Sequence, residues 1–471
     1  MSPNLGYISN KTTILAVFSI LACIFTALLL QKSGFSGNHI VLLELLLAAT
    51  LCWGFNILSF HVVSLALPVA AVILGATEPE QAFSGFTNPS WFLVLAVFAI
   101  AAAISKTGLL YRLALLTVKR FPPSYIGQTF ALSLTGLILT PVIPSANGRA
   151  ALVSPLALNL SEALGFKDNS PGSIGIGMSC LLGFGHMSFM FMNGTATCLL
   201  VLGLLPQETT SGITWAYWLV AALPLGIFFF ILSYFSILLI YRPKEKISLN
   251  LSVIETQLKT LGPVTREEIV SIATILVCLA GFLTEPWHHI NGSWIALVAF
   301  LILFGSSVLD EKSVRADIDW NFLISFGALV GFGVVMTTSG LTGEIAERIS
   351  PVLEFISVNK LLFLLFISLG VYLLRFFLPL APAQLITMLS IIPVATSAGI
   401  NPFVIGLVVL VSSNPWFLPY QNTMYLNLFY GTEEKSFQHR QTLKQAYLHV
   451  LITLVSIALA VPYWYQLGLI S

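Results

Sequence analysis

Residues 140–155 read TPVIPSANGRAALVSP, a polar, proline-rich stretch between two runs that are apolar enough to lie in a lipid bilayer. The stretch contains Ser145, Asn147 and Arg149. A charged side chain at the bilayer centre costs about 2.5–3.5 kcal/mol on the insertion scale. Irregular backbone at that depth is tolerated only where protein or a water-filled cavity supplies hydrogen-bond partners. The stretch therefore predicts a break inside the membrane and a candidate solute site.

The composition of the chain is typical of a membrane protein. Of its 471 residues, 57% are apolar and 9% are charged, whereas soluble domains carry roughly 25% charged residues. The net charge of +1, without a basic cluster, gives no sign of a nucleic acid partner. The five cysteines lie in apolar runs without metal-like spacing, so neither a disulfide framework nor a zinc site is predicted. We therefore expect an all-α polytopic membrane protein surrounded by lipid.

Apolar runs of the roughly 20 residues that a crossing requires recur along the chain and predict about 11 transmembrane helices. The expected spans lie at 12–30, 39–56, 59–75, 90–106, 173–205, 214–241, 267–284, 291–307, 320–338, 402–430 and 446–466. Two further stretches, 125–165 and 361–399, are each divided by a polar break and predict re-entrant hairpins. Stretches 109–121 and 341–357 are amphipathic, which predicts helices in the membrane interface.

Lysine and arginine residues are distributed unevenly among the connections between these spans. With a cytoplasmic N-terminus and two hairpins that return to their own side, only Lys32, Arg348 and Lys360 fall outside the cell. Basic residues concentrate in cytoplasmic loops. We therefore expect a multi-pass protein of the cell membrane, of the bacterial inner-membrane kind, with its N-terminus in the cytoplasm.

The two halves of the chain repeat one order of features. Trp91 leads to Gly108 and Trp320 leads to Gly340, each followed by an amphipathic stretch, an apolar arm, a polar break and a second arm. An odd number of crossings separates equivalent points, so the second copy is expected to be inverted. Inverted repeats with interrupted helices indicate a secondary transporter with its site near the midplane.

These boundaries predict a domain organisation around two inverted repeats. The expected parts are an N-terminal membrane helix at 1–38, a first repeat at 39–241 with hairpin 125–165, a cytoplasmic linker at 242–266, and a second repeat at 267–471 with hairpin 361–399.

Four polar breaks are candidates to line the site, two at the hairpin tips and two in the interrupted spans 173–205 and 402–430. Half-helix N-termini offer N–H donors to an anion, and carbonyl and side-chain oxygens suit Na⁺. The predicted substrate contacts are Ser145, Asn147, Arg149, Thr195, Ala383, Gln384, Asn422 and Thr423. The predicted ligands of a Na⁺ are Ser145, Asn147 and Gly194.

Other roles stay open for several of the polar residues. Ser145 and Asn147 also suit helix caps. Arg149 is able to pair with substrate, to stand in for a coupling cation, or to snorkel to the membrane surface. Arg375 is suited to line the site or to bond to backbone carbonyl groups. His186 is suited to carry a proton or to pack in the protein interior. No Asp or Glu lies at a break, which argues against a proton relay through carboxylates.

At these breaks the chain resembles the divalent anion/sodium symporter family of the ion transporter superfamily. That family has two inverted repeats, each with a hairpin tipped by Ser-Asn-Thr and an unwound helix with a Gly-Thr-Pro-Pro-Asn-like turn. Here Ser145 keeps the motif serine, and Pro155 follows it ten residues later as in the family. Gly194 and Thr195 keep the start of the first unwound turn, but residues 383–385 replace the whole second triplet.

The resemblance implies a small anionic substrate, Na⁺ as coupling ion, no organic cofactor and a homodimer. The motif serine and nearby carbonyls are expected to hold Na⁺, while Asn and Thr meet substrate carboxylates. The altered second triplet argues against a second sodium site. Arg149, just past the first tip, offers the charge that a cation otherwise provides.

The sequence therefore predicts a secondary active transporter for a small anion, such as a di- or tricarboxylate or a sulfate-like ion. It would work by alternating access and be coupled to a cation. A sodium-independent anion exchanger and a carrier of a cation or neutral solute are the alternatives. An intramembrane enzyme has the least support, because the chain shows no nucleophile–base pair, metal-ligand cluster or Gly-rich phosphate loop at membrane depth.

Overall fold

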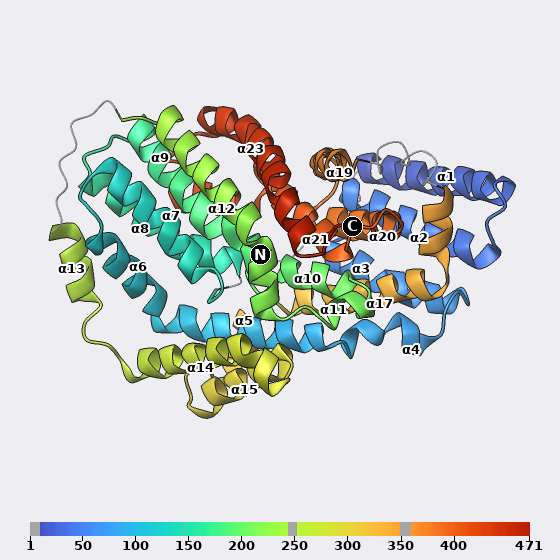
Figure 1. Ribbon diagram of the computed structural model, residues 1–471, viewed down its shortest axis with the longest axis horizontal. Helices are drawn as coiled ribbons and strands as arrows, with labels where there is room; N and C mark the ends of the chain where they lie inside the picture. Colours follow the sequence, from blue (N-terminus) through green and yellow to red (C-terminus); the bar gives the residue numbers. More distant parts are fainter. Residues whose placement is uncertain (1–9, 144, 244–251, 349–358) are drawn as a thin grey trace.

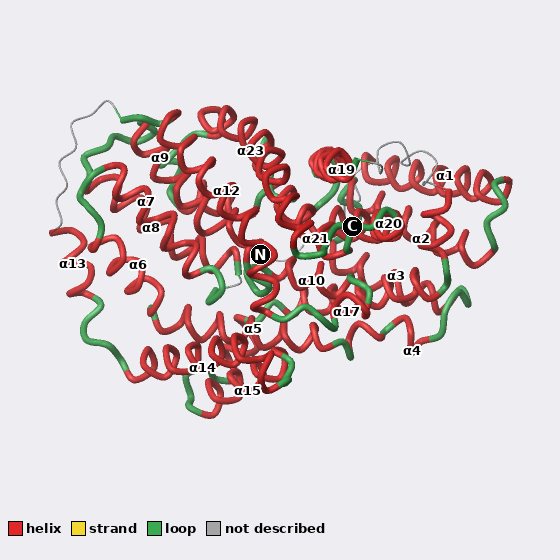
Figure 2. The backbone as a smooth tube through the Cα atoms, in the orientation of Figure 1, coloured by secondary structure: helices red, strands yellow, loops and turns green. Residues whose placement is uncertain are grey.

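The computed structural model describes residues 10–143, 145–243, 252–348 and 359–471, with the backbone alone at 10–13, 146–147 and 252–254. Within these ranges the regular structure is helical, apart from one isolated bridge between Ile400 and Ile470 (Figure 2). The predicted all-α membrane fold is confirmed, whereas the inversion of the two repeats stays a prediction.

The first part of the chain contains the helices expected before the first hairpin. They are α1 (Asn10–Lys32), α2 (Gly37–Gly54), α3 (Phe60–Ile73), the short α4 (Pro79–Ala82) and η1 (Ser84–Phe86), α5 (Pro89–Thr107) and α6 (Leu109–Arg120). Polar caps begin two of the spans: Ser36 accepts the N–H of His39 in α2, and Asn88 accepts that of Ser90 in α5. Such side chains satisfy N–H groups that lack a partner in the first helical turn.

The first hairpin and the interrupted span follow as predicted. The helices are α7 (Tyr125–Leu139), α8 (Ala146–Ala163), α9 (Pro171–Cys180), the π-helical η2 (Leu181–Gly185), the 3₁₀ helix η3 (His186–Met190), α10 (Ala196–Leu204), α11 (Gln207–Thr210), α12 (Trp215–Ile240) and α13 (Ser252–Thr260). A π-helical turn inside a helix frequently marks a functional site.

The second half repeats this order. Its helices are α14 (Arg266–His288), α15 (Gly292–Gly305), α16 (Glu311–Asp317), α17 (Trp320–Thr338), α19 (Lys360–Leu374), α20 (Leu380–Ser397), α21 (Pro402–Ser412), η4 (Pro419–Gln421), α22 (Thr423–Gly431) and α23 (His439–Gln466). Residues 341–348 are helical, and the rest of the predicted interfacial stretch 341–357 lies outside the described residues.

Among the described helices, nine are long and apolar enough to cross a membrane. Two of the predicted spans, α3 and α15, have only 14 residues each, which is about 21 Å at 1.5 Å per residue. The hydrocarbon core of a bilayer is about 30 Å thick. These two helices are therefore too short to cross it unaided.

The helices form an elongated assembly with the broken ones in its middle. Helix α5 runs along one edge, and α14 and α15 pack against it (Figure 1). Helices α7, α8, α9 and α12 gather at one end of the view, and α1, α2, α3 and α17 at the other. Helix α8 of the first hairpin packs on α22, and α20 of the second hairpin packs on α10. Each hairpin is thus joined to the broken helix of the other half.

Glycines bring the first hairpin against the π-helical turn. A Cβ atom on Gly136 of α7 would lie 2.4 Å from the carbonyl carbon of Gly183, and one on Gly183 would lie 2.3 Å from the carbonyl oxygen of Ser133. Only glycine permits backbones to approach this closely. The hairpin tip is therefore held beside the break at 181–195.

Helix α6 carries the basic residues expected in the interface, but it buries one of them. Arg112 donates from Nε to Glu268 at 2.8 Å and from its terminal nitrogens to the carbonyl oxygens of residues 261–263. Only 2% of the Glu268 side chain is exposed. Lys119 pairs with Glu255 of α13 at 3.0 Å. These contacts fix α6 to the segment that leads into α14.

Replacing Arg112 with methionine should destabilise the protein strongly. The substitution leaves the Glu268 carboxylate buried without its cation, a change that costs about 3–5 kcal/mol of unfolding free energy. The midpoint of thermal unfolding of the purified protein in detergent measures the loss. The double variant Arg112→Met/Glu268→Met should recover most of it, because no unpaired charge is left.

The exposed pair between Lys106 and Asp310, 2.8 Å apart, supplies the matched control. The hydrogen bond from the Lys106 ammonium holds the pKa of the Asp310 carboxyl well below its ordinary value, but solvent-exposed pairs contribute little to stability. Lys106→Met should leave the midpoint nearly unchanged. Equal shifts for Lys106→Met and Arg112→Met would contradict the structural role of the buried pair.

Candidate functional site

The first hairpin turns back between α7 and α8, where the described residues 140–143 and 145 do not continue either helix. Ser145 caps α8 by accepting the N–H of Gly148 at 3.2 Å. On the α7 side, Thr140 donates to the carbonyl oxygen of Gly136 at 2.7 Å. Asn147 belongs to the first turn of α8, but its side chain lies outside what the structure describes. The tip is therefore built as a capped half-helix whose N-terminus faces inward.

Arg149 lies one turn into α8 and is fully buried. Its Nη1 donates to the carbonyl oxygens of Ile143 at 2.5 Å and Gly194 at 2.7 Å, so it ties the hairpin tip to the broken helix. Its Nε has no hydrogen-bond partner among the described residues. None of the ion pairs of the described residues includes Arg149. The side chain does not snorkel to the surface, and its charge is not neutralised by a carboxylate.

The loop before α10 provides the second set of polar groups. Thr195 caps α10 by accepting the N–H of Cys198 at 3.3 Å, and its hydroxyl lies 2.9 Å from that of Thr197. Asn193 donates to the carbonyl oxygen of Pro141 at 2.7 Å and accepts from the indole of Trp215 at 2.9 Å. Asn193 thus holds the loop in place, while the two threonine hydroxyls stay near the N-terminus of α10.

The second hairpin has its own buried arginine, which is used differently. Arg375, at the end of α19, donates to the carbonyl oxygens of Ser413, Leu378 and Gln421. The Gln421 amide donates back to the carbonyl oxygen of Arg375 at 3.1 Å. The three groups that the Arg375 guanidinium contacts are backbone carbonyl oxygens of the two breaks. The Gln421 side chain in turn binds the backbone of Arg375. Arg375 therefore binds the backbone together, the structural role that the sequence left open.

Asn422 follows Gln421 and caps the N-terminus of α22. Its side-chain oxygen accepts the N–H of Tyr425 at 3.0 Å, and its amide donates to the carbonyl oxygen of Asn414 at 3.0 Å. Thr423 is the first residue of α22. Asn422 thus caps α22 as Thr195 caps α10 in the first half.

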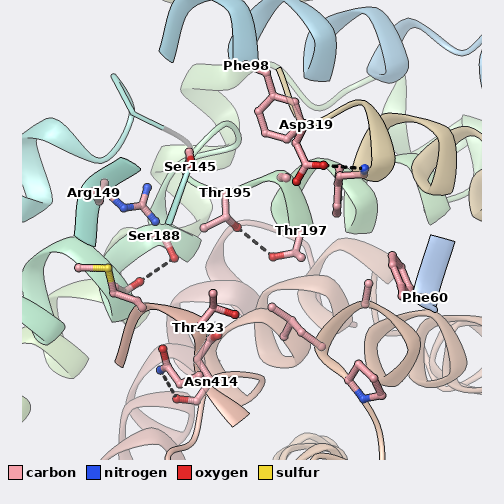
Figure 3. A pocket seen from close by; sticks show the side chains of 18 of the residues that line it. Phe60, Phe98, Ser145, Arg149, Ser188, Thr195, Thr197, Asp319, Asn414 and Thr423 are labelled. Atoms are coloured by element: carbon pink, nitrogen blue, oxygen red, sulfur yellow. Dashed lines mark hydrogen bonds between the residues drawn. The ribbon is translucent and has the colours of Figure 1, made fainter. Parts of the chain in front are cut away.

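The breaks enclose one cavity of about 300 Å³ (Figure 3). It is lined by Phe60, Phe98, Ser145, Arg149, Gly185, Ser188, Thr195, Ala196, Thr197, Asp319, Phe322, Pro379, Leu380, Ala381, Pro382, Asn414, Asn422, Thr423 and Met424. Figure 3 shows Arg149 and Asp319 reaching it from different sides, with Thr195 and Thr197 between them. The lining thus combines groups from both hairpins and both interrupted helices.

Five of the predicted substrate contacts line this cavity: Ser145, Arg149, Thr195, Asn422 and Thr423. Ala383 and Gln384 are fully buried but do not line it. Helix α20 already begins at Leu380, so residues 383 and 384 lie inside the helix, and Pro379 to Pro382 line the cavity instead. Both polar atoms of the Gln384 side chain lack a partner among the described residues.

Several lining residues were not predicted from the sequence. Ser188 and Thr197 lie within breaks that were identified, but were not singled out there. Asp319 lies before α17, where its carboxylate accepts the N–H of Phe322 at 3.0 Å. An Asp just before an apolar run is a signal for a helix cap, but it gives no sign of a cavity. The fold therefore places an exposed carboxylate at the site although no break contains one.

Sodium is the ion that the resemblance implies for the first tip, and its expected oxygens are only partly free. The Gly194 carbonyl oxygen already accepts from Arg149 at 2.7 Å. A Na⁺ on the same oxygen would be repelled by the guanidinium. The described residues hold no group of three His, Cys, Asp or Glu suited to a metal. In this arrangement the Gly194 carbonyl does not fit a Na⁺, and Ser145 is left as the one available predicted oxygen whose side chain is described.

Known proteins resemble the whole chain. A family model described as the sodium:sulfate symporter transmembrane region matches residues 10–470. The inner membrane protein YbhI of Escherichia coli K12 is 26% identical over 348 residues, which cover 73% of this chain and 72% of that protein. The citrate/succinate antiporter of the same organism is 27% identical over 362 residues, 75% of this chain and 73% of the antiporter.

A solved structure shares the fold. The Alcanivorax borkumensis YdaH transporter superposes on 90% of this chain and 100% of its own with a TM-score of 0.56, at 16% sequence identity. The family match covers nearly the whole chain, and the family and these relatives are membrane proteins and transporters rather than enzymes. The chain therefore belongs to the sodium:sulfate symporter family, the divalent anion/sodium symporters, and is a multi-pass membrane transporter.

Proposed function

We propose that the protein is a secondary active transporter of small organic di- or tricarboxylates, coupled to the movement of a cation. The observation that carries this proposal is Arg149, a buried cation at the wall of a cavity that no carboxylate of the described residues neutralises. A buried charge is stable only when it is paired and hydrogen-bonded. An anionic solute would supply the missing partner.

The apolar part of the lining favours carboxylates over sulfate. Phe98, Phe322, Leu380 and Met424 line the cavity together with the polar groups. A di- or tricarboxylate offers carbon atoms to such walls, whereas sulfate offers only oxygens. The volume of about 300 Å³ is at the lower end of the range of about 300–1,000 Å³ for small-molecule sites. The substrate is therefore expected to be a short-chain acid.

The mechanism we propose is alternating access. Phe60, Asp319 and Phe322 line the cavity and lie at the beginnings of α3 and α17. In the orientation expected from the positive-inside rule, these ends face the cytoplasm. The described arrangement would then be the inward-facing one. The hairpins with α9, α10, α21 and α22 would move against α1–α5, α14, α15 and α17, with α6 and residues 341–357 as links.

The same reasoning extends to the expected domains and assembly. The repeats at 39–241 and 267–471 would be inverted copies, with the segment 242–266 as a cytoplasmic linker. A homodimer through α1–α5, α14, α15 and α17 would leave the hairpin-bearing part free to move. The mass of the purified protein in detergent, after subtraction of bound detergent, tests the dimer.

Sodium-independent exchange is the second candidate. It is supported by Arg149 at the Gly194 carbonyl, where a cation would otherwise bind, and by the relative described as a citrate/succinate antiporter. An exchanger needs an anion on both sides of the membrane, whereas a symporter fills empty vesicles.

Replacing Arg149 should weaken anion binding. A hydrogen bond to a charged group contributes about 1.5–3 kcal/mol, so Arg149→Gln should raise the apparent Kd for succinate or citrate by about 10- to 100-fold. Arg149→Lys keeps the charge on a shorter side chain with fewer donors, so its Kd should lie between those of the unchanged protein and Arg149→Gln. Binding is measured by thermal shift on folded, purified protein.

The matched control is Arg120→Gln, which removes an exposed arginine of α6 that does not line the cavity. Arg120→Gln should bind succinate and citrate with the affinity of the unchanged protein. If Arg149→Gln folds and binds citrate and succinate as tightly as Arg120→Gln does, the assignment of Arg149 to the substrate is wrong.

Uptake of radiolabelled succinate and citrate into proteoliposomes should separate symport from exchange. A cation-coupled symporter should accumulate label in vesicles without internal anion, and only while a gradient of Na⁺ or protons is present. An exchanger should take up label only into vesicles preloaded with unlabelled anion. Absence of uptake for every anion under both conditions would contradict the proposed function.

A further inference from the structure

Two histidines meet deep inside the hairpin-bearing part of the protein. His186 begins η3, directly after the π-helical turn, and His449 lies in α23. Their ring centroids are 4.6 Å apart, and only 7% and 2% of the two residues are exposed. Two buried imidazoles this close cannot both be charged, because like charges at short range in a poorly hydrated site repel strongly. The pair is therefore able to carry at most one positive charge.

Aromatic rings surround this pair. The indole of Trp416 stacks on His186 with centroids 4.8 Å apart and an angle of 26° between the planes, and it lies 4.9 Å from His449. Phe229 directs its edge at both histidines. The face of an indole attracts a cation. Trp416 therefore favours the charged form of the pair, although the burial opposes it.

Three polar atoms beside the pair lack hydrogen-bond partners among the described residues. They are Nε2 of His449, Oε1 of Gln445 and Nε1 of Trp416. A cavity of about 10 Å³ is lined by these three residues and His186, which is about the space that one water molecule needs. Buried polar atoms are rarely left without partners. A water molecule is able to accept from the Trp416 indole and to donate to Gln445 Oε1, whereas an added proton would give His449 Nε2 a hydrogen to donate.

The pair is joined to the large cavity through one residue. Nε2 of His186 lies 3.3 Å from the side-chain amide nitrogen of Asn422, and Asn422 lines the 300 Å³ cavity. On the other side, the Gln445 amide donates to the hydroxyl of Ser236 at 2.6 Å. Asn422 therefore links the histidine pair to the cavity wall, so a change in the charge of the pair would alter the electrostatic potential there.

The other titratable or charged groups around the pair are few. Tyr372 of α19 lies with its ring 6.2 Å from that of His449, and Tyr425 of α22 stacks on Trp416 and contacts His439. Arg375 binds the carbonyl oxygens next to Asn414 and Asn422. Helix α12 presents Phe229 and Ser233, which carry no charge. Among the described residues, no hydrogen bond or ion pair brings a carboxylate to the pair.

We propose that His186 and His449 bind one proton together with the transported anion and thereby couple transport to the proton gradient. His449 Nε2, which has no hydrogen-bond partner among the described residues, accepts the proton from the surrounding solution. Without an anion, the positive charge of Arg375 and the lack of a counter-ion oppose this step. An anion in the cavity supplies the counter-ion, so each ligand strengthens binding of the other. This inference rests on the proposed function and names its coupling ion.

The coupling is testable as proton uptake on anion binding. Purified protein in weakly buffered detergent solution, with a pH indicator dye, should take up about one proton when succinate or citrate binds. The affinity for the anion should fall by up to tenfold per unit rise in pH across the range in which the pair titrates. In proteoliposomes, an inward proton gradient should drive accumulation of either anion.

His186→Gln and His449→Gln should each abolish proton uptake and flatten the pH dependence of anion affinity, while binding itself persists. His289→Asn is the matched control: His289 is exposed, lies in a loop at φ +57° that asparagine tolerates, and should change nothing. Folding of each variant is checked by its thermal unfolding midpoint.

The outcomes separate the two claims. Anion binding by the unchanged protein without proton uptake overturns the role of the histidine pair, whatever the variants do, and leaves the anion site standing. Unaltered proton uptake in both folded variants overturns it as well. If succinate, citrate and sulfate all fail to bind at any pH, the proposed function falls and the coupling falls with it.

Discussion

Helices that break inside an apolar environment free backbone carbonyl groups, and the structure depends on how these groups are paired. An unpaired buried polar group costs about 1–3 kcal/mol, and a lipid environment offers no water to relieve it. Two buried arginines supply the donors. Arg149 joins the carbonyl oxygens of Ile143 and Gly194, and Arg375 joins those of Leu378, Ser413 and Gln421. Each arginine connects a hairpin to the broken helix of its own half.

The two arginines differ in what they leave free. Arg375 directs three nitrogens at backbone carbonyls and does not line the cavity. Arg149 uses one terminal nitrogen for both of its carbonyl contacts and lies at the cavity wall. Arg375 therefore holds the backbone of the breaks together away from the cavity, while Arg149 makes its structural contacts at the cavity wall and keeps an Nε without a hydrogen-bond partner among the described residues.

The sequence predicted the all-α membrane fold and the polar breaks that line the cavity, since both depend on strong local signals. Long apolar runs, proline-rich breaks and the position of Arg149 sufficed to place most helices and to expect a site where the breaks meet. The site residues that were predicted wrongly or missed depend on where a helix begins and on contacts between residues far apart in the sequence. Ala383 and Gln384 are buried away from the cavity because α20 begins at Leu380. Asp319 was missed because its sequence context indicates only a helix cap, and the histidine pair because His186 and His449 are 263 residues apart (449 − 186).

The central claim is that the four breaks form the binding site of the transported anion. A high-resolution map of the full-length protein with citrate or succinate bound tests it most directly. The account predicts ligand density within hydrogen-bonding distance of Arg149, between Thr195 and Asn422. Density instead in the separate cavity of about 480 Å³ that Glu285 and Asn291 line, with the space beside Arg149 empty, would contradict it.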